Sequence, residues 1–219
     1  MKKTILLILL FFAGFTGYGQ AQISFVNALT IDPNVYDDIA GTPYLFDNWR
    51  TGKIISYLDT VVVDLDINYN GYTKSFEIRK GNKFILLDEE YYQEVLIDNP
   101  DNPEYPFHFT KYAPGDLSGQ WTLVYDEGEK YSLYRTFIAG LTEDEIQDVG
   151  KTIKMRTFQN KRVYYLYSNG ELTSLRIKKK NMRAVFGKNF DVIVKKNKFK
   201  LDRHADMVQF MRQVNELEN

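Results

Sequence analysis

The sequence contains no cysteine, and only two of its 219 residues are histidine. Without cysteine the chain forms no disulfide bond, iron–sulfur cluster or cysteine-type zinc site, and it has no thiol nucleophile. The same absence excludes the attachment of a lipid to an N-terminal cysteine. Packing and hydrogen bonding alone must therefore hold the fold together.

The two histidines, His108 and His204, lie far apart, and neither has a second histidine three or four residues away. A zinc site would need both of them together with a carboxylate, and no spacing indicates this. A Ser-His-Asp triad is recognised in space, so it stays open, although the chain has no Gly-x-Ser-x-Gly motif. The nucleotide-binding and metalloprotease motifs are also absent. We therefore predict no catalytic, cofactor-binding or metal-binding residues, and a protein that is not an enzyme.

Long apolar runs are absent except near the first residue. Two lysines precede an unbroken apolar run, residues 5–12, and the small residues Gly17, Gly19 and Ala21 follow it. This order is typical of a secretory signal peptide that is cleaved after Gly19 or after Ala21. A retained anchor is the alternative, but the run is shorter than the roughly 18–20 residues of a spanning helix. We predict Sec-dependent export, with residues 1–22 as the signal peptide. The mature chain would be periplasmic, secreted or associated with the outer membrane, and would have no transmembrane segment.

Charge is nearly balanced, with a formal net charge of −1, but it is unevenly distributed. Residues 88–148 hold 15 acidic and three basic residues, whereas residues 176–203 hold 11 basic and two acidic residues. This asymmetry predicts either docking of the acidic middle on the basic end or two surfaces of opposite charge. Nucleic-acid binding is the more specific of two interpretations of the basic stretch, and a solvated charged face is the other. Because that stretch alternates with apolar residues and the chain is expected to be exported, we predict a solvated face and no nucleic-acid partner.

Alternating side chains predict a β-hairpin in the first half of the chain. Odd positions are apolar in residues 61–69, and residues 72–79 alternate again after Asn70-Gly71. A two-residue Asn-Gly turn would pair Tyr69 with Tyr72 and place every apolar partner on one face. The solvent face of this predicted hairpin would then hold Asp66, Asn68 and Glu77.

Further strands are predicted on both sides of this hairpin. Residues 53–58 and 83–87 flank it and complete a four-stranded meander. Residues 98–119, which contain four prolines, indicate a loop and a candidate boundary. Two more hairpins are expected, one turning at residues 126–129 and one at Asn169-Gly170. Between them Thr142 and Glu145 form a capping box, which predicts a short helix over Thr142–Val149.

The last 40 residues change to a helical pattern. A helix is predicted over residues 178–186, ending at Gly187, and a second over residues 189–196. Asp202 is a good N-cap for the final helix. On that helix a stripe of apolar side chains predicts a face turned toward the core; it consists of Met207, Phe210, Met211, Val214 and Leu217.

The fold class expected from these patterns is mainly β (α+β). Antiparallel hairpins and a meander sheet would be followed by two or three short C-terminal helices. After the signal peptide we expect an N-terminal β-meander region over residues 23–99 and a second hairpin-rich region over residues 100–177. A helical tail over residues 178–219 is expected to pack on the sheet.

One local pattern raises the possibility of a calcium site. The residues Asp66, Asn68, Asn70, Gly71 and Glu77 match the spacing of an EF-hand loop, in which oxygen ligands surround the ion. An EF-hand loop lies between helices, however, and both flanks of this pattern alternate as strands do. The hairpin accounts for the same residues, so a metal site is not expected.

Several segments resemble a group of small exported proteins of Gram-negative bacteria whose function is not established. They are residues 41–49 (Gly-Thr-Pro-Tyr-Leu-Phe-Asp-Asn-Trp), Gly52-Lys-Ile, Asn68-Tyr-Asn70 and the lysine-rich stretch from Lys178. The resemblance implies export and an architecture of strands followed by a lysine-rich helical tail. It implies no active-site residues.

Two functions follow as expectations. The first is a non-catalytic exported protein that binds a protein partner in the envelope or the extracellular space, since strand edges can add to a partner's sheet. The alternative is a carbohydrate-binding or carbohydrate-active protein. Its basis is the aromatic content of 15% and acidic groups such as Asp37-Asp38 and Asp88-Glu89-Glu90.

Overall fold

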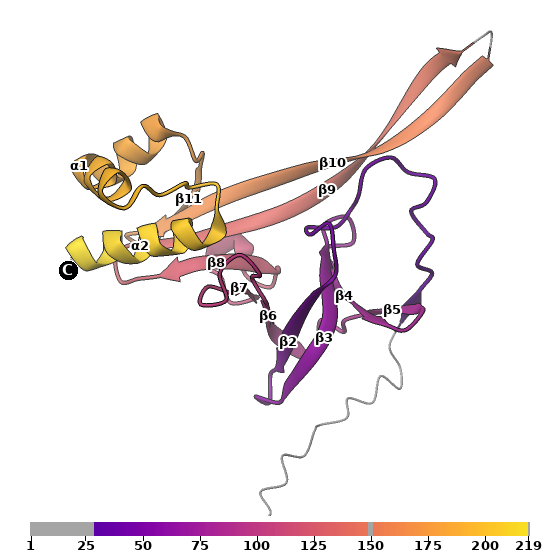
Figure 1. The fold of residues 1–219 in the computed structure, drawn as a ribbon, viewed down its shortest axis with the longest axis horizontal. Helices are drawn as coiled ribbons and strands as arrows, with labels where there is room; N and C mark the ends of the chain where they lie inside the picture. The colour runs from indigo at the N-terminus through magenta and orange to yellow at the C-terminus, as the bar shows by residue number, and fades with distance from the viewer. Residues whose placement is uncertain (1–28, 149–150, 219) are drawn as a thin grey trace, which may run out of the picture.

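The computed structural model of this protein describes residues 29–148 and 151–218. The predicted signal peptide, residues 1–22, lies outside the described residues. Within them the chain forms one large antiparallel sheet followed by two α-helices (Figure 1). The strands are β1 (Thr30–Ile31), β2 (Arg50–Ser56), β3 (Val61–Asn70), β4 (Ser75–Lys80), β5 (Lys83–Leu86), β6 (Tyr92–Ile97), β7 (Phe107–Thr110), β8 (Thr122–Glu127), β9 (Ser132–Asp148), β10 (Lys151–Ser168) and β11 (Glu171–Leu175). The helices are η1 (Gly115–Leu117), α1 (Lys179–Asn197) and α2 (His204–Glu218).

The sheet has the strand order β1-β5-β4-β3-β2-β6-β7-β8-β9-β10-β11. The prediction of a mainly β fold with a C-terminal helical part is confirmed. Strand β7, which the sequence did not predict, pairs with β6 and with β8. It continues the sheet from residues 23–99 into residues 100–177. One hydrophobic core draws side chains from both regions and from the two α-helices.

The predicted meander is confirmed, with β2, β3, β4 and β5 adjacent in that order. The hairpin predicted at Asn169-Gly170 is also confirmed. The hairpin predicted to turn at residues 126–129 is present, but its turn lies at residues 128–131, because Asp126 and Glu127 pair with β9. The register predicted for the β3–β4 hairpin is wrong, because Tyr69 lies opposite Phe76 and not opposite Tyr72. The change is an even number of residues, so the apolar side chains still share one face.

The β3–β4 loop contains four residues, not two, because the side chain of Asn70 builds a wider turn. Its Oδ1 accepts hydrogen bonds from the backbone N–H groups of Tyr72 at 2.9 Å and of Thr73 at 3.2 Å. This is the local bonding by which asparagine favours turns. Lys74 then adopts the left-handed conformation, with φ of 58°.

Gly71 is needed in this loop for close packing. Its N–H donates to the carbonyl of Pro43 at 2.8 Å, and its own carbonyl accepts from the N–H of Ala139 at 3.1 Å. A Cβ at this position would lie 2.6 Å from the ring of Phe137. The loop therefore lies between the lead-in segment, residues 29–49, and strand β9.

The second face of the β3–β4 hairpin is buried, so the predicted solvent face is wrong for two of its three residues. Asn68 and Glu77 are 2% and 0% exposed, and only Asp66 lies at the surface. The lead-in segment covers this face and pairs with it, with Tyr44 opposite Asn70. Alternation in the sequence could not reveal this cover, because the covering segment lacks a strand pattern.

Hydrogen bonds compensate for the burial of Glu77. Its two carboxyl oxygens accept from Nδ2 of Asn70 and from the hydroxyl of Tyr44, each at 2.7 Å. Nδ2 of Asn70 also donates to the hydroxyl of Tyr36 at 3.0 Å. Burial raises the pKa of Glu77, and the two hydrogen bonds lower it. We call these four residues the Glu77 network.

Residues 142–148 belong to strand β9, so the short helix predicted over Thr142–Val149 is wrong; Val149 itself lies outside the described residues. A helix of eight residues is marginal in water unless it packs against something. Strand β10 lies alongside instead, and the pairing continues from Ser132 opposite Tyr167 to Asp148 opposite Lys151. The backbone pairing of β9 with β10 therefore determines the structure of residues 142–148, and the local capping box does not.

The far ends of β9 and β10 project from the sheet as a two-stranded ribbon (Figure 1). Strand β8 pairs with β9 only as far as Arg135, and β11 pairs with β10 only from Tyr164 onward. The lead-in segment adds one bridge, between Ala40 and Thr157. We call residues 143–148 and 151–156, which lie beyond this bridge, the β9–β10 arm.

The C-terminal helices follow the predicted pattern closely. Gly187 has φ of 58° and ψ of −140° and breaks α1 where the sequence predicted one helix to end. Helix α2 begins at His204, one residue later than a cap at Asp202 implies. Four residues of the predicted stripe are fully buried, whereas Leu217 is 59% exposed.

Replacing Glu77 with leucine is expected to lower the free energy of unfolding by about 3 kcal/mol. The donors on Asn70 and Tyr44 lose their acceptor, and each unpaired buried donor costs roughly 1–3 kcal/mol. Urea denaturation followed by intrinsic fluorescence measures the loss. Glu77→Gln is the matched control, since it keeps the size of the side chain and an acceptor oxygen for Asn70. Equal losses in both variants would contradict a role for these hydrogen bonds.

Candidate functional site

The residues of the calcium-like pattern are all engaged in other contacts. Asp66 forms a salt bridge with Arg79 at 2.9 Å. Asn68 exchanges hydrogen bonds with the backbone of Phe46, and Glu77 belongs to the buried network. Among residues 29–148 and 151–218, no group of three or more histidine, aspartate or glutamate side chains could hold a metal ion.

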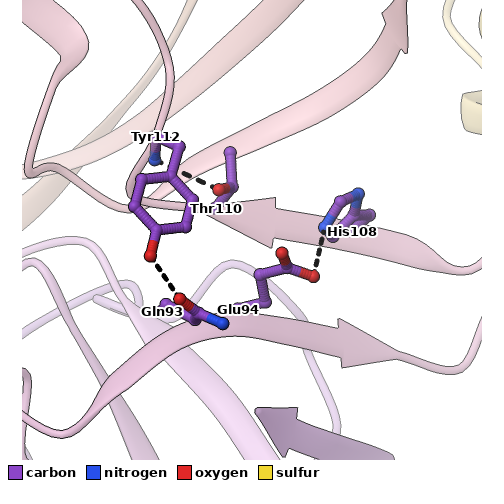
Figure 2. A network of polar contacts seen from close by, with 5 residues as sticks. All are labelled: Gln93, Glu94, His108, Thr110 and Tyr112. Carbon is purple, nitrogen blue, oxygen red and sulfur yellow. Dashed lines mark hydrogen bonds and ion pairs between the residues drawn. The ribbon is translucent and has the colours of Figure 1, made fainter. Parts of the chain in front are cut away.

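His108 belongs to a polar network on strands β6 and β7 (Figure 2). Its Nε2 lies 3.2 Å from Oε2 of Glu94. Nearby, the hydroxyl of Tyr112 donates to Gln93, and the backbone N–H of Tyr112 donates to Thr110 at 3.1 Å. The figure shows Gln93, Glu94, His108 and Thr110 on the adjacent strands β6 and β7, with Tyr112 in the loop that follows β7.

Two exposed tyrosines accompany this network. Tyr112 is 59% exposed and Tyr57 is 45% exposed, and their rings lie 6.4 Å apart in an edge-to-face arrangement. Exposed aromatic rings beside carboxylate and amide groups can stack on a sugar and bind its hydroxyls. This surface is therefore the one that best fits the carbohydrate hypothesis.

A second candidate site is a polar cavity of about 720 Å³ at the start of helix α2. We call it the arginine pocket, because four arginines line it, from β2, β9, β10 and the segment before α2. They are Arg50, Arg135, Arg162 and Arg203. Its other polar residues come mainly from the lead-in segment, the β6–β7 loop and α2, and include Asp47, Asn99, Asp101, Asn102, Asp202, His204 and Asp206.

Arg135 is the most deeply placed of these arginines, with 8% of its surface exposed. Its Nη1 donates to the hydroxyl of Tyr125 at 2.9 Å, and the guanidinium lies over the Tyr125 ring. Its Nε has no hydrogen-bond partner, and the described residues give it no ion pair. Burial raises the pKa of Tyr125, so that hydroxyl stays neutral and does not compensate the charge.

His204 lies against the same tyrosine and is 9% exposed. Its ring stacks on Phe107 with centroids 4.4 Å apart. Its Nε2 lies 3.0 Å from the carbonyl of Pro106, which only accepts, so Nε2 carries the proton. Burial and the nearby Arg135 lower the pKa of His204 to about 4, whereas its bond to Pro106 raises it. The neutral ring leaves Nδ1 as an acceptor without a partner.

A neighbouring cavity of about 820 Å³ lies between strands β10 and β11, helix α1 and the segment that connects α1 to α2. Its walls are mostly apolar, with Met182 and Phe190 from α1 and Leu175 from β11. Five basic residues also line it: Lys161, Arg162, Arg176, Lys178 and Lys179. Arg162 and Asp202 line both cavities, so the two adjoin. The basic end of the sequence thus borders a cavity.

The side chains of the arginine pocket provide positive charge, hydrogen-bond donors and hydrogen-bond acceptors for a ligand. The sequence identified His204 only as one of two histidines, and it did not identify Arg135. A signal was present, because Leu133, Arg135 and Phe137 share one face of β9, and the first and third are core residues. An arginine at a core position of a strand indicates a site that needs a cation.

Comparison with known proteins finds no matching family model, no matching curated protein and no matching solved structure. The resemblance to small exported proteins of Gram-negative bacteria therefore stays a prediction. Among the helices of the described residues, none combines the length and the apolar character that crossing a bilayer requires.

Protein stability is expected to fall as the pH decreases from about 6.5 to about 4, in part because of His204. Its pKa is about 4 in the folded protein, against an ordinary value of 6.5. Between these two pH values the unfolded chain binds a proton at His204 that the folded chain does not bind. The free energy of unfolding therefore keeps its full contribution from His204 above pH 6.5 and loses it as the pH falls toward 4. The contribution of His204 is of the order of 3 kcal/mol.

Denaturation curves of the wild type and of His204→Gln at several pH values test this prediction. Glutamine retains a donor for the carbonyl of Pro106 but does not titrate. The raised pKa of Glu77 acts with the opposite sign and is common to both proteins, so it cancels in the difference. A difference in stability that is constant from pH 7 to pH 4 would contradict the assignment of a neutral, buried His204.

Proposed function

We propose that this chain is an exported, non-catalytic protein that binds a protein partner in the envelope or the extracellular space through the β9–β10 arm. The observation that carries the proposal is the arm itself. Both of its strands have one edge that no other described strand covers. Such edges present unpaired N–H and C=O groups, to which a strand of another protein can pair.

The two faces of the arm differ in character. One face is charged: Lys154 pairs with Glu143 at 3.0 Å, and Arg156 pairs with Asp38 of the lead-in segment. The other face carries Ile153 and Met155, which are 48% and 41% exposed. An isolated two-stranded hairpin is only marginally stable in water. A partner that covers the apolar face would stabilise the arm and bury these side chains.

Two further expectations belong to the proposal. Export rests on the signal-peptide pattern of residues 1–22. The lack of catalysis rests on the surroundings of the two histidines within the described residues, where His108 bonds to Glu94 and His204 to the carbonyl of Pro106. Neither imidazole is hydrogen-bonded to a serine or threonine nucleophile there.

The second candidate function is carbohydrate binding. The observation that favours it is the pair of exposed rings, Tyr57 and Tyr112, beside the polar network of Figure 2. A sugar could stack on the exposed faces of these two rings.

Changing Ile153 and Met155 together to lysine is expected to abolish capture of the partner while leaving the thermal stability of the body nearly unchanged. Both side chains lie on an exposed ribbon, so their loss affects an interface and not the core. Crosslinking in whole cells, followed by affinity purification and mass spectrometry, compares the variant with the wild type.

The matched control is Val192→Lys, which removes an exposed apolar side chain, 59% exposed, from helix α1. We expect it to retain the partner. A partner that the wild type, the double variant and the control all retain equally would refute a role for the arm. Recovery of no reproducible partner by the wild type would count against the proposed function as a whole.

Replacing Tyr112 with alanine tests the carbohydrate alternative. If the two exposed rings bind sugars, a glycan array should give wild-type signals that fall about fivefold or more in this variant, since one stacking contact is worth roughly 1 kcal/mol or more. Tyr72→Ala is the control, because this exposed tyrosine contacts Tyr36 and Phe158 instead. An array without any wild-type signal would remove this candidate.

A further inference from the structure

We propose that the arginine pocket binds a small hydroxylated oxyanion, such as a sugar acid or a sugar phosphate, with Arg135 as its central anion ligand. This site is separate from the β9–β10 arm and does not depend on the function proposed for the arm. The inference rests on two buried groups without partners, on the gathering of arginines, and on the polar groups at the rim.

The first observation is the uncompensated charge of Arg135. Arginine is almost never buried without an anionic partner, because removing its charge from water is costly. The guanidinium of Arg135 contacts the neutral hydroxyl of Tyr125, to which it donates a hydrogen bond, and the face of the same ring. Its Nε has no acceptor. A bound oxyanion would supply both the missing charge and the missing acceptor.

The second observation is that further arginines line the same cavity, two of them without an ion pair among the described residues. Within the described residues neither Arg162 nor Arg203 has a carboxylate within salt-bridge distance, and both side chains are exposed. Arg50 lies over the ring of Phe46, with its guanidinium carbon 4.2 Å from the centroid; burial lowers the pKa of Arg50, and the nearby carboxylates of Asp101 and Asp47 raise it. Guanidinium groups bind carboxylate and phosphate in forked geometry, so their convergence points to an oxyanion.

The third observation concerns hydroxyl groups. Nδ1 of His204 is a buried acceptor without a donor, and it lies near Arg135, whose Nε lacks an acceptor. A simple oxyanion satisfies the guanidinium only, whereas a ligand with a neighbouring hydroxyl satisfies both groups. At the rim, Asp47, Asp101 and Asn102 provide further acceptors and donors for hydroxyls.

The size of the cavity agrees with this class of ligand. Its volume of about 720 Å³ lies within the usual range for small-molecule sites, roughly 300–1,000 Å³. The neutral imidazole and the carboxylates at the rim also disfavour a ligand that is anionic over its whole surface. The charged end of the ligand is therefore expected at Arg135 and its hydroxyls toward His204 and the rim.

Thermal-shift and calorimetric titrations of the full mature chain test the proposal with defined probes. The probes are glucuronate, gluconate, glucose 6-phosphate, inorganic phosphate, acetate and glucose, each at millimolar concentration. We expect at least one hydroxylated oxyanion to raise the melting temperature and to bind more tightly than acetate, phosphate or glucose. Comparison of the carboxylates with the sugar phosphate identifies which oxyanion the pocket prefers.

Two variants locate the binding. Arg135→Met and Arg162→Gln should each weaken the best probe by about tenfold to a hundredfold, as expected for the loss of a charge-assisted hydrogen bond. Arg162 is exposed, so its variant should fold even if the first does not. Arg176→Gln is the matched control, because this exposed arginine lines only the neighbouring cavity; its affinity should equal that of the wild type.

Stability without ligand separates a binding role from a structural one. If Arg135 serves a ligand, Arg135→Met should be as stable as the wild type or more stable, because an unpaired buried cation is removed. If its bond to Tyr125 holds the fold, the variant should be less stable. A destabilised Arg135→Met together with unchanged affinity in Arg162→Gln would overturn the proposal. So would the absence of any shift with every oxyanion, whereas equal binding of phosphate and the sugar ligands would refute the hydroxyl contacts.

Discussion

The hydrogen bonds of the β3–β4 loop hold two distant parts of the sheet against each other. Gly71 bonds to Pro43 on one side and to Ala139 of β9 on the other, and Asn70 fixes the shape of the loop while binding Glu77. Four strands separate β3 from β9 in the strand order. The twist of the sheet brings the two close, and the missing Cβ of Gly71 lets them touch. Since the chain has no disulfide, this contact and the core beneath it define the shape of the molecule.

Both candidate binding features depend on how β9 is held. Arg135 lies near the start of this strand, and the arm begins at Glu143, about 26 Å further along if the strand is fully extended. The first part of β9 lies between β8 and β10 and faces the C-terminal helices, so a polar side chain there becomes buried. Among the described strands the last part pairs with β10 alone, and it extends into solvent. One strand thus contributes a buried cation at one end and an open edge at the other.

The elements that depend on neighbouring residues could be predicted from the sequence. The meander, the turn at Asn169-Gly170 and the break at Gly187 all follow from alternation, turn chemistry or the left-handed conformation that glycine tolerates. The wrong β3–β4 register has a local cause, the bonds of the Asn70 side chain within the loop, but the other errors arose where a distant segment determines the structure. The lead-in segment covers Asn68 and Glu77, and strand β10 converts a local helix signal at Thr142 into strand. The arginine pocket was beyond prediction for the same reason, because five separate parts of the chain contribute to it.

The presence of Arg135 in the core is itself an argument for a ligand. Single domains are stable by only about 5–15 kcal/mol, so a buried charge without a partner is a substantial fraction of that margin. Leucine or methionine at this position would extend the apolar face that Leu133 and Phe137 form on β9. Natural proteins retain such costly residues mainly where function requires them. The Glu77 network shows that this chain can compensate the burial of an ionisable group with hydrogen bonds. Arg135 has no such set of partners among the described residues, and a bound oxyanion would supply the acceptor that its Nε lacks.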